Sequence, residues 1–369
     1  MPRPTYAEVD LAAVRHNLRT LRARLAPGVQ VLGVVKANAY GHGAVEVSRA
    51  LEAEAVDLLG VALVEEGAQL RAAGIRSPVL VMGALPADDV AAAIEQDLTP
   101  TVDGPETAGP IEACAARQGR TVAVHLKIDT GMNRLGVRAE AAAEAAAALG
   151  RMKHLRLAGA YTHFACADCE ADDVSPGQLA RFRSALAAMQ AAGLRPPLVH
   201  AANSSALLVL SESHFDMVRS GLALYGICPC PAARAVPLRP ALALKSRVAC
   251  LKAVRAGEGV SYGHRWRAAR ESLIGVLPIG YADGYPRALS DGGQVRVEGR
   301  LVPVVGAVCM DMTMIDLTGV PGVGPGQEVT LIEADNSSPI SAAAVAEQAG
   351  TIPYEILTGL SKRLPRTYR

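Results

Sequence analysis

The sequence lacks an excess of charge of either sign. Its 369 residues include 37 lysines and arginines and 36 aspartates and glutamates, which leaves a net charge of +1. A protein that binds nucleic acid or an anionic membrane surface would be expected to carry a basic excess. The charge balance therefore gives no support to either kind of partner.

Long apolar segments are also missing. No run reaches the ~18–20 residues that a membrane-spanning helix requires. The N-terminal Met-Pro-Arg-Pro-Thr-Tyr lacks the apolar core of a secretory signal. Half of the residues are hydrophobic, which is enough to bury a large core. We therefore expect a cytoplasmic enzyme or binding protein.

Lysine is scarce, because arginine supplies most of the positive charge. Arginine stays protonated near neutrality, so chemistry that needs an amine able to lose its proton has few candidates here. The chain has six lysines: Lys36, Lys127, Lys153, Lys245, Lys252 and Lys362.

Cysteine is present in an odd number, seven, and a chain of this length needs no disulfides to be stable. Cys166 and Cys169, with His163 before them and Cys228 and Cys230 later, raise the possibility of a zinc site. Their spacing fits poorly with the paired ligands of a structural zinc site. We expect semi-buried thiols in a reducing compartment and no metal.

A regular alternation of short apolar runs and alanine-rich stretches occupies the first two thirds of the chain. Eight strand-like runs alternating with helices indicate parallel βαβ units, and eight is the number that closes a TIM-type (β/α)8 barrel. An open doubly wound sheet would show a G-x-G-x-x-G fingerprint after the first strand, and none is present. The predicted strands cover residues 29–35, 58–62, 79–82, 98–102, 122–128, 155–162, 198–202 and 217–225.

The composition changes near residues 229–240, where four prolines cluster. Alternating apolar runs then replace the helices, and turn pairs such as Asp283-Gly284 and Glu298-Gly299 separate them. We predict a barrel domain over residues 1–235 and a mostly-β domain over 236–369, with residues 1–10 packing on the second domain. Asp10 is the predicted N-cap of a first helix. The later predicted strands cover residues 244–253, 273–278, 294–297, 301–308, 312–317 and 327–331, followed by helical segments 342–349 and 354–360.

The active site of a TIM-type barrel lies at the carboxyl ends of its strands. Lys36 ends the first predicted strand and is followed by small, glycine-rich residues that leave room for a flat ligand. Partial burial lowers the pKa of a lysine, as a Schiff-base nucleophile requires. Ser204 and Gly221 follow the strands that usually hold phosphate in this fold. Together these features suggest pyridoxal phosphate.

The segment Val-Val-Lys-Ala-Asn-Ala-Tyr-Gly-His-Gly at residues 34–43 resembles the cofactor attachment motif of alanine racemases. The resemblance implies an eight-stranded α/β barrel followed by a β-domain, pyridoxal phosphate as cofactor, and interconversion of L- and D-alanine. That reaction would supply D-alanine for peptidoglycan or degrade it. Further matching segments follow in the family's order at residues 125–136, 161–165, 200–204, 260–263, 280–285, 309–312 and 352–355.

The resemblance also implies catalytic roles. Lys36 and Tyr262 would act as bases on opposite faces of the substrate, with Tyr262 contributed by the second subunit of a homodimer. Arg134 and Met310 would bind substrate. Lys127 matches a lysine that is carbamylated in many members, and an ordinary ion pair with a carboxylate such as Asp129 stays open as the alternative.

The remaining roles implied by the resemblance concern the cofactor and access to it. Arg219 would face the pyridine nitrogen, and His163 would lie beside the ring. Tyr281 and Asp311, together with Tyr354 and Met310, would narrow the channel by which substrate enters. The other cofactor-binding residues would be Tyr40, Asn203, Ser204, Gly221 and Tyr354.

Three alternatives remain at this point. A racemase of broader substrate range would share every motif, and a few substitutions could widen the pocket. A pyridoxal-phosphate-binding homeostasis protein would share the barrel but lack the second domain. A barrel-type amino-acid decarboxylase would be expected to carry a glutamate where Arg219 stands.

Overall fold

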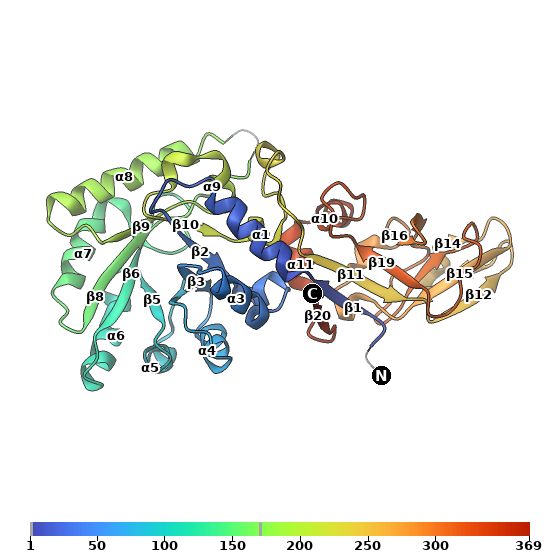
Figure 1. Cartoon of the computed structure of the whole chain (residues 1–369), viewed down its shortest axis with the longest axis horizontal. Helices are drawn as coiled ribbons and strands as arrows, with labels where there is room; N and C mark the ends of the chain where they lie inside the picture. Colours follow the sequence, from blue (N-terminus) through green and yellow to red (C-terminus); the bar gives the residue numbers. More distant parts are fainter. Residues whose placement is uncertain (1–2, 170–171) are drawn as a thin grey trace.

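The computed structural model describes residues 3–169 and 172–369, and it consists of a barrel and an elongated β-rich part beside it (Figure 1). All pairings between the barrel strands are parallel, and the ring closes where β5 pairs with β6. The predicted (β/α)8 barrel is confirmed. Its strands are β2 (Gln30–Val34), β3 (Leu58–Val61), β4 (Val79–Val81), β5 (Thr99–Val102), β6 (Val122–Asp129), β8 (Leu155–Tyr161), β9 (Leu198–His200) and β10 (Met217–Ser220).

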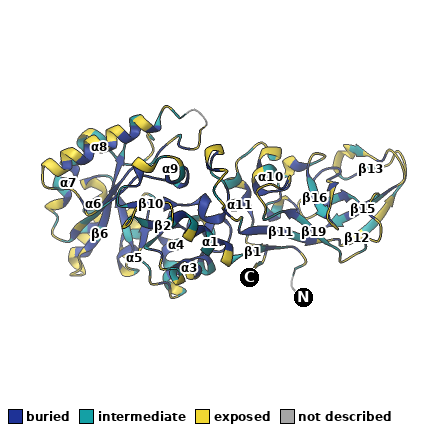
Figure 2. Ribbon diagram, turned by 45° about the horizontal axis from the view of Figure 1, so that its top comes forward, coloured by how far each residue is buried: buried dark blue, intermediate teal, exposed yellow. Residues whose placement is uncertain are grey.

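Helices surround this ring and bury their apolar faces against it. Figure 2 shows exposed residues on the outer faces of the helices and buried ones on the strands. Asp10 caps the first helix as predicted, since its Oδ1 accepts the amide of Ala13 at 2.9 Å. The principal helices are α1 (Leu11–Arg22), α3 (Ala44–Ala53), α4 (Val64–Ala72), α5 (Val90–Glu95), α6 (Pro105–Arg117), α7 (Ala142–Gly150), α8 (Ser175–Ala191) and α9 (Ser204–Val209).

Among the helices of the described residues, none combines the length and the apolarity that crossing a membrane demands.

The last barrel strand is shorter than predicted. The prediction of one strand over residues 217–225 is wrong beyond Ser220, because Leu222–Tyr225 forms a 3-10 turn, η4. All four residues of this turn are buried. A short run that is buried on every side has no periodicity, so a strand cannot be told from a helical turn by pattern alone.

The β-rich part contains three sheets. Its six-stranded sheet has the order β17-β16-β19-β11-β1-β20, in which β1 (Tyr6–Val9), near the N-terminus, lies between β11 and β20. Two helices, α10 (Ala342–Ala349) and α11 (Pro353–Gly359), follow the last long strand. The other strands are β11 (Leu242–Arg247), β12 (Cys250–Val254), β13 (Gly259–Val260), β14 (Trp266–Arg267), β15 (Ser272–Leu277), β16 (Gln294–Val297), β17 (Arg300–Pro303), β18 (Thr313–Asp316), β19 (Glu328–Ile332) and β20 (Arg366–Tyr368).

Three further details differ from the sequence predictions. The strand predicted over residues 301–308 ends at Pro303 in β17, and beyond it only Val304 pairs, in a single bridge to Ile315. The apolar run continues to Val308, but the positive φ of Gly306, +72°, is incompatible with a strand. The single strand predicted over residues 244–253 is two strands, β11 and β12, which belong to different sheets. Glu298-Gly299 does form the two-residue turn between β16 and β17, with positive φ at both positions. Asp283-Gly284 instead ends a 3-10 turn.

Candidate active site

Lys36 lies at the mouth of the barrel, directly after β2. Burial lowers the pKa of its amine, and the nearby positive charge of Arg134 lowers it further, against an opposing effect of Glu66. A lysine with a lowered pKa spends more time as the neutral amine, which is the form that attacks a carbonyl or accepts a proton.

The backbone after Lys36 turns in the left-handed sense within α2 (Lys36–Tyr40). Residues 37–40 all have φ between +50° and +54°, a conformation that costs L-residues roughly 1–2 kcal/mol each. The Glu66 carboxylate accepts the amide of Ala37 at 2.6 Å, and Arg366 donates to the carbonyl of Gly41 at 3.1 Å. The strained turn is therefore held from both sides, as strained backbone at functional sites usually is.

A small cradle of hydroxyl and amide groups faces this turn. Ser204 Oγ accepts the amides of Gly221 at 2.9 Å and Ala223 at 3.3 Å. A Cβ atom at Gly221 would lie 2.6 Å from Tyr40 Oη, so a side chain there would displace the Tyr40 hydroxyl. The Tyr40 and Tyr354 rings are 5.8 Å apart. The hydroxyl protons of Ser204 and Tyr40 are the donors that this arrangement could offer to a phosphate group.

Arg219 is buried among neutral hydrogen-bond acceptors. Its guanidinium donates to the carbonyls of Thr162 and Ala201, both at 2.8 Å, and to Nδ1 of His200 and His163 at 3.0 and 3.1 Å. Burial lowers its pKa to about 10, which leaves it protonated at neutral pH. Among residues 3–169 and 172–369, no carboxylate bonds to this guanidinium.

The structure adds two histidines that the sequence analysis did not assign to the site. A guanidinium can only donate, so Nδ1 of His200 accepts and its proton lies on Nε2. That Nε2 lies 2.9 Å from Nδ1 of His125, and burial lowers the pKa of His125 to about 4. Both histidines lie on barrel strands, within apolar runs. A polar residue inside such a run is the sequence feature that could have identified them.

Lys127, on β6, is buried and has no hydrogen-bond partner among the described residues. Its Nζ lies 4.4 Å from the centroid of the Tyr161 ring. Burial, together with the charge of Arg219, holds its pKa well below the usual range. The carboxylate of Asp129 accepts backbone amides instead, including that of Gly131 at 3.0 Å. The alternative of a Lys127–Asp129 ion pair is therefore not found.

Two further predicted site residues, Arg134 and Asn203, follow barrel strands. Arg134 is exposed in the loop between β6 and β7 (Val137–Arg138). Asn203 caps α9, with its Oδ1 accepting the amide of Ala206 at 2.9 Å. Because capping occupies this side-chain oxygen, the cofactor-binding role of Asn203 stays a prediction.

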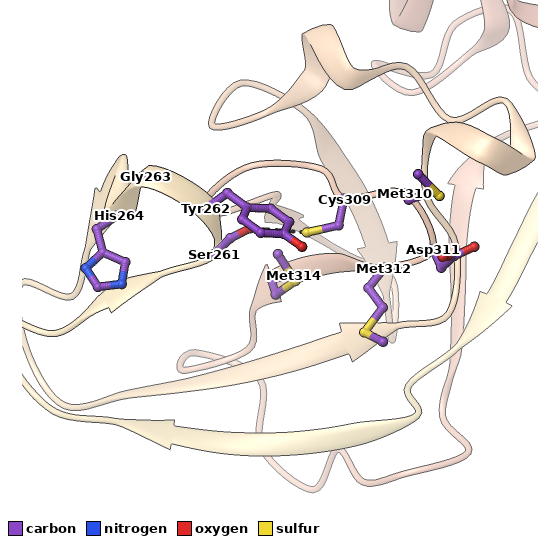
Figure 3. Close-up of a pocket in the computed structure, with 9 residues that line it drawn as sticks. All are labelled: Ser261, Tyr262, Gly263, His264, Cys309, Met310, Asp311, Met312 and Met314. Carbon is purple, nitrogen blue, oxygen red and sulfur yellow. Dashed lines mark hydrogen bonds between the residues drawn. The ribbon is translucent and has the colours of Figure 1, made fainter.

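A second group of candidates lies in the β-rich part and not at the barrel mouth. Tyr262, Met310 and Asp311 line a cavity of about 530 Å³ (Figure 3). The Tyr262 side chain is 75% exposed. Tyr281 is linked to the same segment, since its amide donates to the carbonyl of Cys309 at 3.0 Å. Within one chain, therefore, Lys36 and Tyr262 belong to separate surfaces.

The four cysteines weighed as zinc ligands are free thiols. Over residues 3–169 and 172–369, no three histidine, cysteine, aspartate or glutamate side chains are grouped in a way that could hold a metal ion. His163 contacts Arg219.

Comparison with known proteins accounts for nearly the whole chain. Residues 9–229 match the family model of the alanine racemase N-terminal domain, and residues 241–368 match that of the C-terminal domain. The chain belongs to the alanine racemase family. Alanine racemases are isomerases, and they share both parts of the structure described above. The alternative of a homeostasis protein is excluded, because such proteins lack the second domain and this chain has it.

Individual alanine racemases are similar over their full lengths. The alanine racemase of Symbiobacterium thermophilum is 44% identical over 99% of this chain and 97% of its own, and that of Desulfovibrio desulfuricans is 42% identical over 99% and 98%. Among solved structures, the alanine racemase of a D-cycloserine-producing Streptomyces lavendulae superposes with a TM-score of 0.94 at 40% identity. That match covers 100% of this chain and 98% of that one.

Proposed function

We propose that this chain interconverts L-alanine and D-alanine with pyridoxal phosphate bound at Lys36. In this proposal Lys36 and Tyr262 exchange protons with opposite faces of the substrate Cα. The observation that carries it is an amine of lowered pKa, Lys36, at the start of the strained turn whose Tyr40 lies against Ser204 and Gly221. Membership of the alanine racemase family supports the reaction.

The residues present fit the cofactor. Tyr40 and Ser204 offer hydroxyl groups to a phosphate beside Gly221, since Ser204 Oγ accepts two amides and can still donate its own proton. Tyr354 approaches the Tyr40 ring from α11. When bound, pyridoxal phosphate supplies an aldehyde that couples to amines and a ring that accepts the electron pair left at Cα.

Arg219 is proposed to face the pyridine nitrogen, with His163 beside the ring. Among the described residues its hydrogen-bond partners are two carbonyls and two histidines of lowered pKa, so no anion offsets its charge. That charge would disfavour a proton on the pyridine nitrogen. By keeping that nitrogen unprotonated, Arg219 would weaken the electron withdrawal that the ring supplies, which would favour proton return to Cα over side reactions.

Arg134 is proposed to hold the substrate carboxylate, and Met310 is proposed to contact the substrate. Lys127 is suited to carbamylation, because a carbamate forms only from a neutral amine. A carbamate would replace the amine by an anion within reach of Arg134, whose charge already acts on Lys127. In this way Lys127 would fix the orientation of Arg134.

Tyr262 is proposed to act in the barrel of a second copy of the chain, in a homodimer. Support comes from its 75% exposure and from the cavity it lines with Met310 and Asp311, away from Lys36. Tyr281 and Tyr354 would help to narrow access and restrict the substrate to alanine. A cytoplasmic location and a role in supplying or degrading D-alanine stay predictions.

The test combines chemical trapping with a chiral assay. Protein loaded with pyridoxal phosphate and reduced with borohydride should carry the pyridoxyl group on the Lys36 peptide, located by mass spectrometry. Lys36→Ala should lose both this label and racemisation of either enantiomer, whereas Lys153→Ala, which removes an exposed lysine, should keep both. A label on another lysine, or racemisation retained by Lys36→Ala, would contradict the proposal.

A further inference from the structure

The short loop that carries Tyr262, residues 261–265, begins with an unusual backbone conformation. Ser261 has φ +64° and ψ −173°, a region occupied almost only by glycine. A residue with a Cβ atom stays there only when its surroundings hold it. Since Tyr262 is the next residue, the path of the chain at Ser261 sets the direction in which the phenol leaves the loop.

The Ser261 hydroxyl joins this loop to a second segment, residues 306–310. Its Oγ donates to the carbonyl of Ala307 at 2.7 Å and lies 3.3 Å from Sγ of Cys309, the residue before Met310 (Figure 3). One side chain thus connects the backbone that bears Tyr262 with the backbone that bears Met310. Both of these residues line the same cavity.

A second tie holds the far end of the loop to the same segment. The Asp291 carboxylate accepts the amide of Gly306 at 2.6 Å and lies 3.3 Å from Nε of Arg265. The segment runs so close to the loop that a Cβ atom at Gly306 would lie 2.6 Å from the carbonyl oxygen of Val260. The loop is therefore fixed at both ends.

Tyr262 itself makes no side-chain hydrogen bond to any residue that the structure describes, and most of its ring is exposed. Its ring points from the loop toward Cys309 and Met310 in Figure 3. Within one chain, therefore, the backbone on either side of Tyr262 sets the direction of its Cα–Cβ bond and so the side of the loop from which the phenol leaves. Ser261 is the residue that controls the backbone on the N-terminal side.

We propose that Ser261 is a positioning residue for racemisation: its hydroxyl, bound to the Ala307 carbonyl, holds the strained backbone that aims the Tyr262 phenol at the substrate Cα. This inference rests on the proposed function, in which Tyr262 is one of two bases. Lys36 serves the other face from a different part of the fold. Loss of the Ser261 hydroxyl therefore weakens proton transfer on one face only.

The experiment measures the initial rate at which the Cα hydrogen of each alanine enantiomer exchanges with D2O. In Ser261→Ala, exchange should fall by roughly 10- to 100-fold for the enantiomer served by Tyr262, the size expected for a misplaced catalytic group. Exchange of the other enantiomer should stay near the wild-type rate. Ser272→Ala is the matched control, since it removes a hydroxyl bonded to a backbone carbonyl in the same β-rich part, outside the cavity.

Two further measurements keep the result decisive. Ser261→Gly removes the same hydroxyl and tolerates the positive φ, so we expect it to fold even if Ser261→Ala does not. Because glycine adopts this backbone without strain but no longer holds it in place, its loss should be one-sided too and no larger than that of Ser261→Ala. In cofactor-free protein, amide hydrogen exchange should rise in residues 260–264 and 306–310 for both Ser261 variants but not for Ser272→Ala. Unchanged exchange in these segments, or an equal loss for both enantiomers, would overturn the role of Ser261.

Tyr262→Phe in the same assay separates this inference from the proposed function. A one-sided loss in Tyr262→Phe without one in the Ser261 variants would refute Ser261 alone. An absence of one-sided loss in Tyr262→Phe would remove the base assignment on which both depend.

Discussion

Lys127 and Arg219 both approach the ring of Tyr161, with Nζ of Lys127 4.4 Å and Cζ of Arg219 5.2 Å from its centroid. No carboxylate bonds to either group among the described residues. Two charges of one sign are costly in a buried site. Arginine cannot readily release its proton, so Lys127 is the residue that becomes neutral.

A neutral, buried amine is able to take up carbon dioxide as a carbamate. We predict that protein equilibrated with ¹³C-bicarbonate shows a carbamate resonance by NMR, and that Lys127→Ala lacks it. Lys153→Ala, at an exposed lysine, should keep the resonance. Wild-type protein without any carbamate signal would show that Lys127 acts as a plain amine.

Sequence alone identifies a site residue where the reaction requires an amino acid that is rare in this chain. Only six lysines were available, and strand position selected Lys36 and Lys127. His125 and His200 were not assigned, because a histidine inside an apolar strand is equally compatible with ordinary core packing. Their role depends on a hydrogen-bonded chain across β6, β9 and β10, which no local pattern encodes.

At the level of elements, the left-handed turn after β2 depends on its contact with α11. Gly41 has φ +81°, and a Cβ atom there would lie 2.0 Å from the carbonyl oxygen of Leu357. Gly74 has φ +83° with no atom within 4 Å of such a Cβ. The two glycines therefore share a positive φ and differ in their surroundings.

This pair provides a matched prediction. Gly74→Ala should lower the free energy of unfolding by about 1 kcal/mol, the cost of an alanine at positive φ. Gly41→Ala should lower it by about 1–3 kcal/mol more, because the methyl group forces α11 away from the turn. Urea unfolding of both variants measures the difference. Equal losses would show that α11 does not constrain the turn.

Element prediction from sequence succeeded where a strand had flanking turn residues and failed where it did not. The eight barrel strands were located by their apolar runs. The error at Leu222–Tyr225 arose because a buried run has no exposed face to reveal its period. The error at residues 244–253 arose because Val248 continues the apolar pattern while the chain passes from one sheet to another.

At the scale of the whole molecule, buried histidines make folding sensitive to acid. Burial lowers the pKa of His42 and of His125 to about 4, from an ordinary value of 6.5. Between these values the unfolded chain binds protons that the folded chain does not. The free energy of unfolding should therefore fall as the pH drops, by about 1.4 kcal/mol per pH unit for each histidine.

Urea unfolding at a series of pH values between neutrality and pH 4 measures this slope. His42→Asn removes one of these groups, so the variant should show a shallower dependence than the parent. Above neutrality these histidines are neutral in the folded and the unfolded state. They should then contribute no pH dependence to the free energy of unfolding of either protein. An identical slope in the variant would mean that His42 takes up its proton without unfolding.

The whole-molecule arrangement was the part least accessible from sequence. Composition and periodicity indicated two kinds of architecture but did not show that Tyr262 lies on a surface separate from Lys36. That separation follows from the position of the Tyr262 loop between β13 and β14, in the β-rich part (Figure 1). In the sequence analysis, a site shared between two chains rested on resemblance alone.

Mixing two inactive variants tests the shared site most directly. Each Lys36→Ala/Tyr262→Phe heterodimer would contain one site with both bases and one with neither. Differently tagged chains, exchanged and purified as mixed dimers, should regain racemisation approaching half that of the wild-type dimer, while each parent dimer stays inactive. Mixed dimers that fold and bind cofactor yet remain inactive would contradict the account, because Tyr262 would then have to act within its own chain.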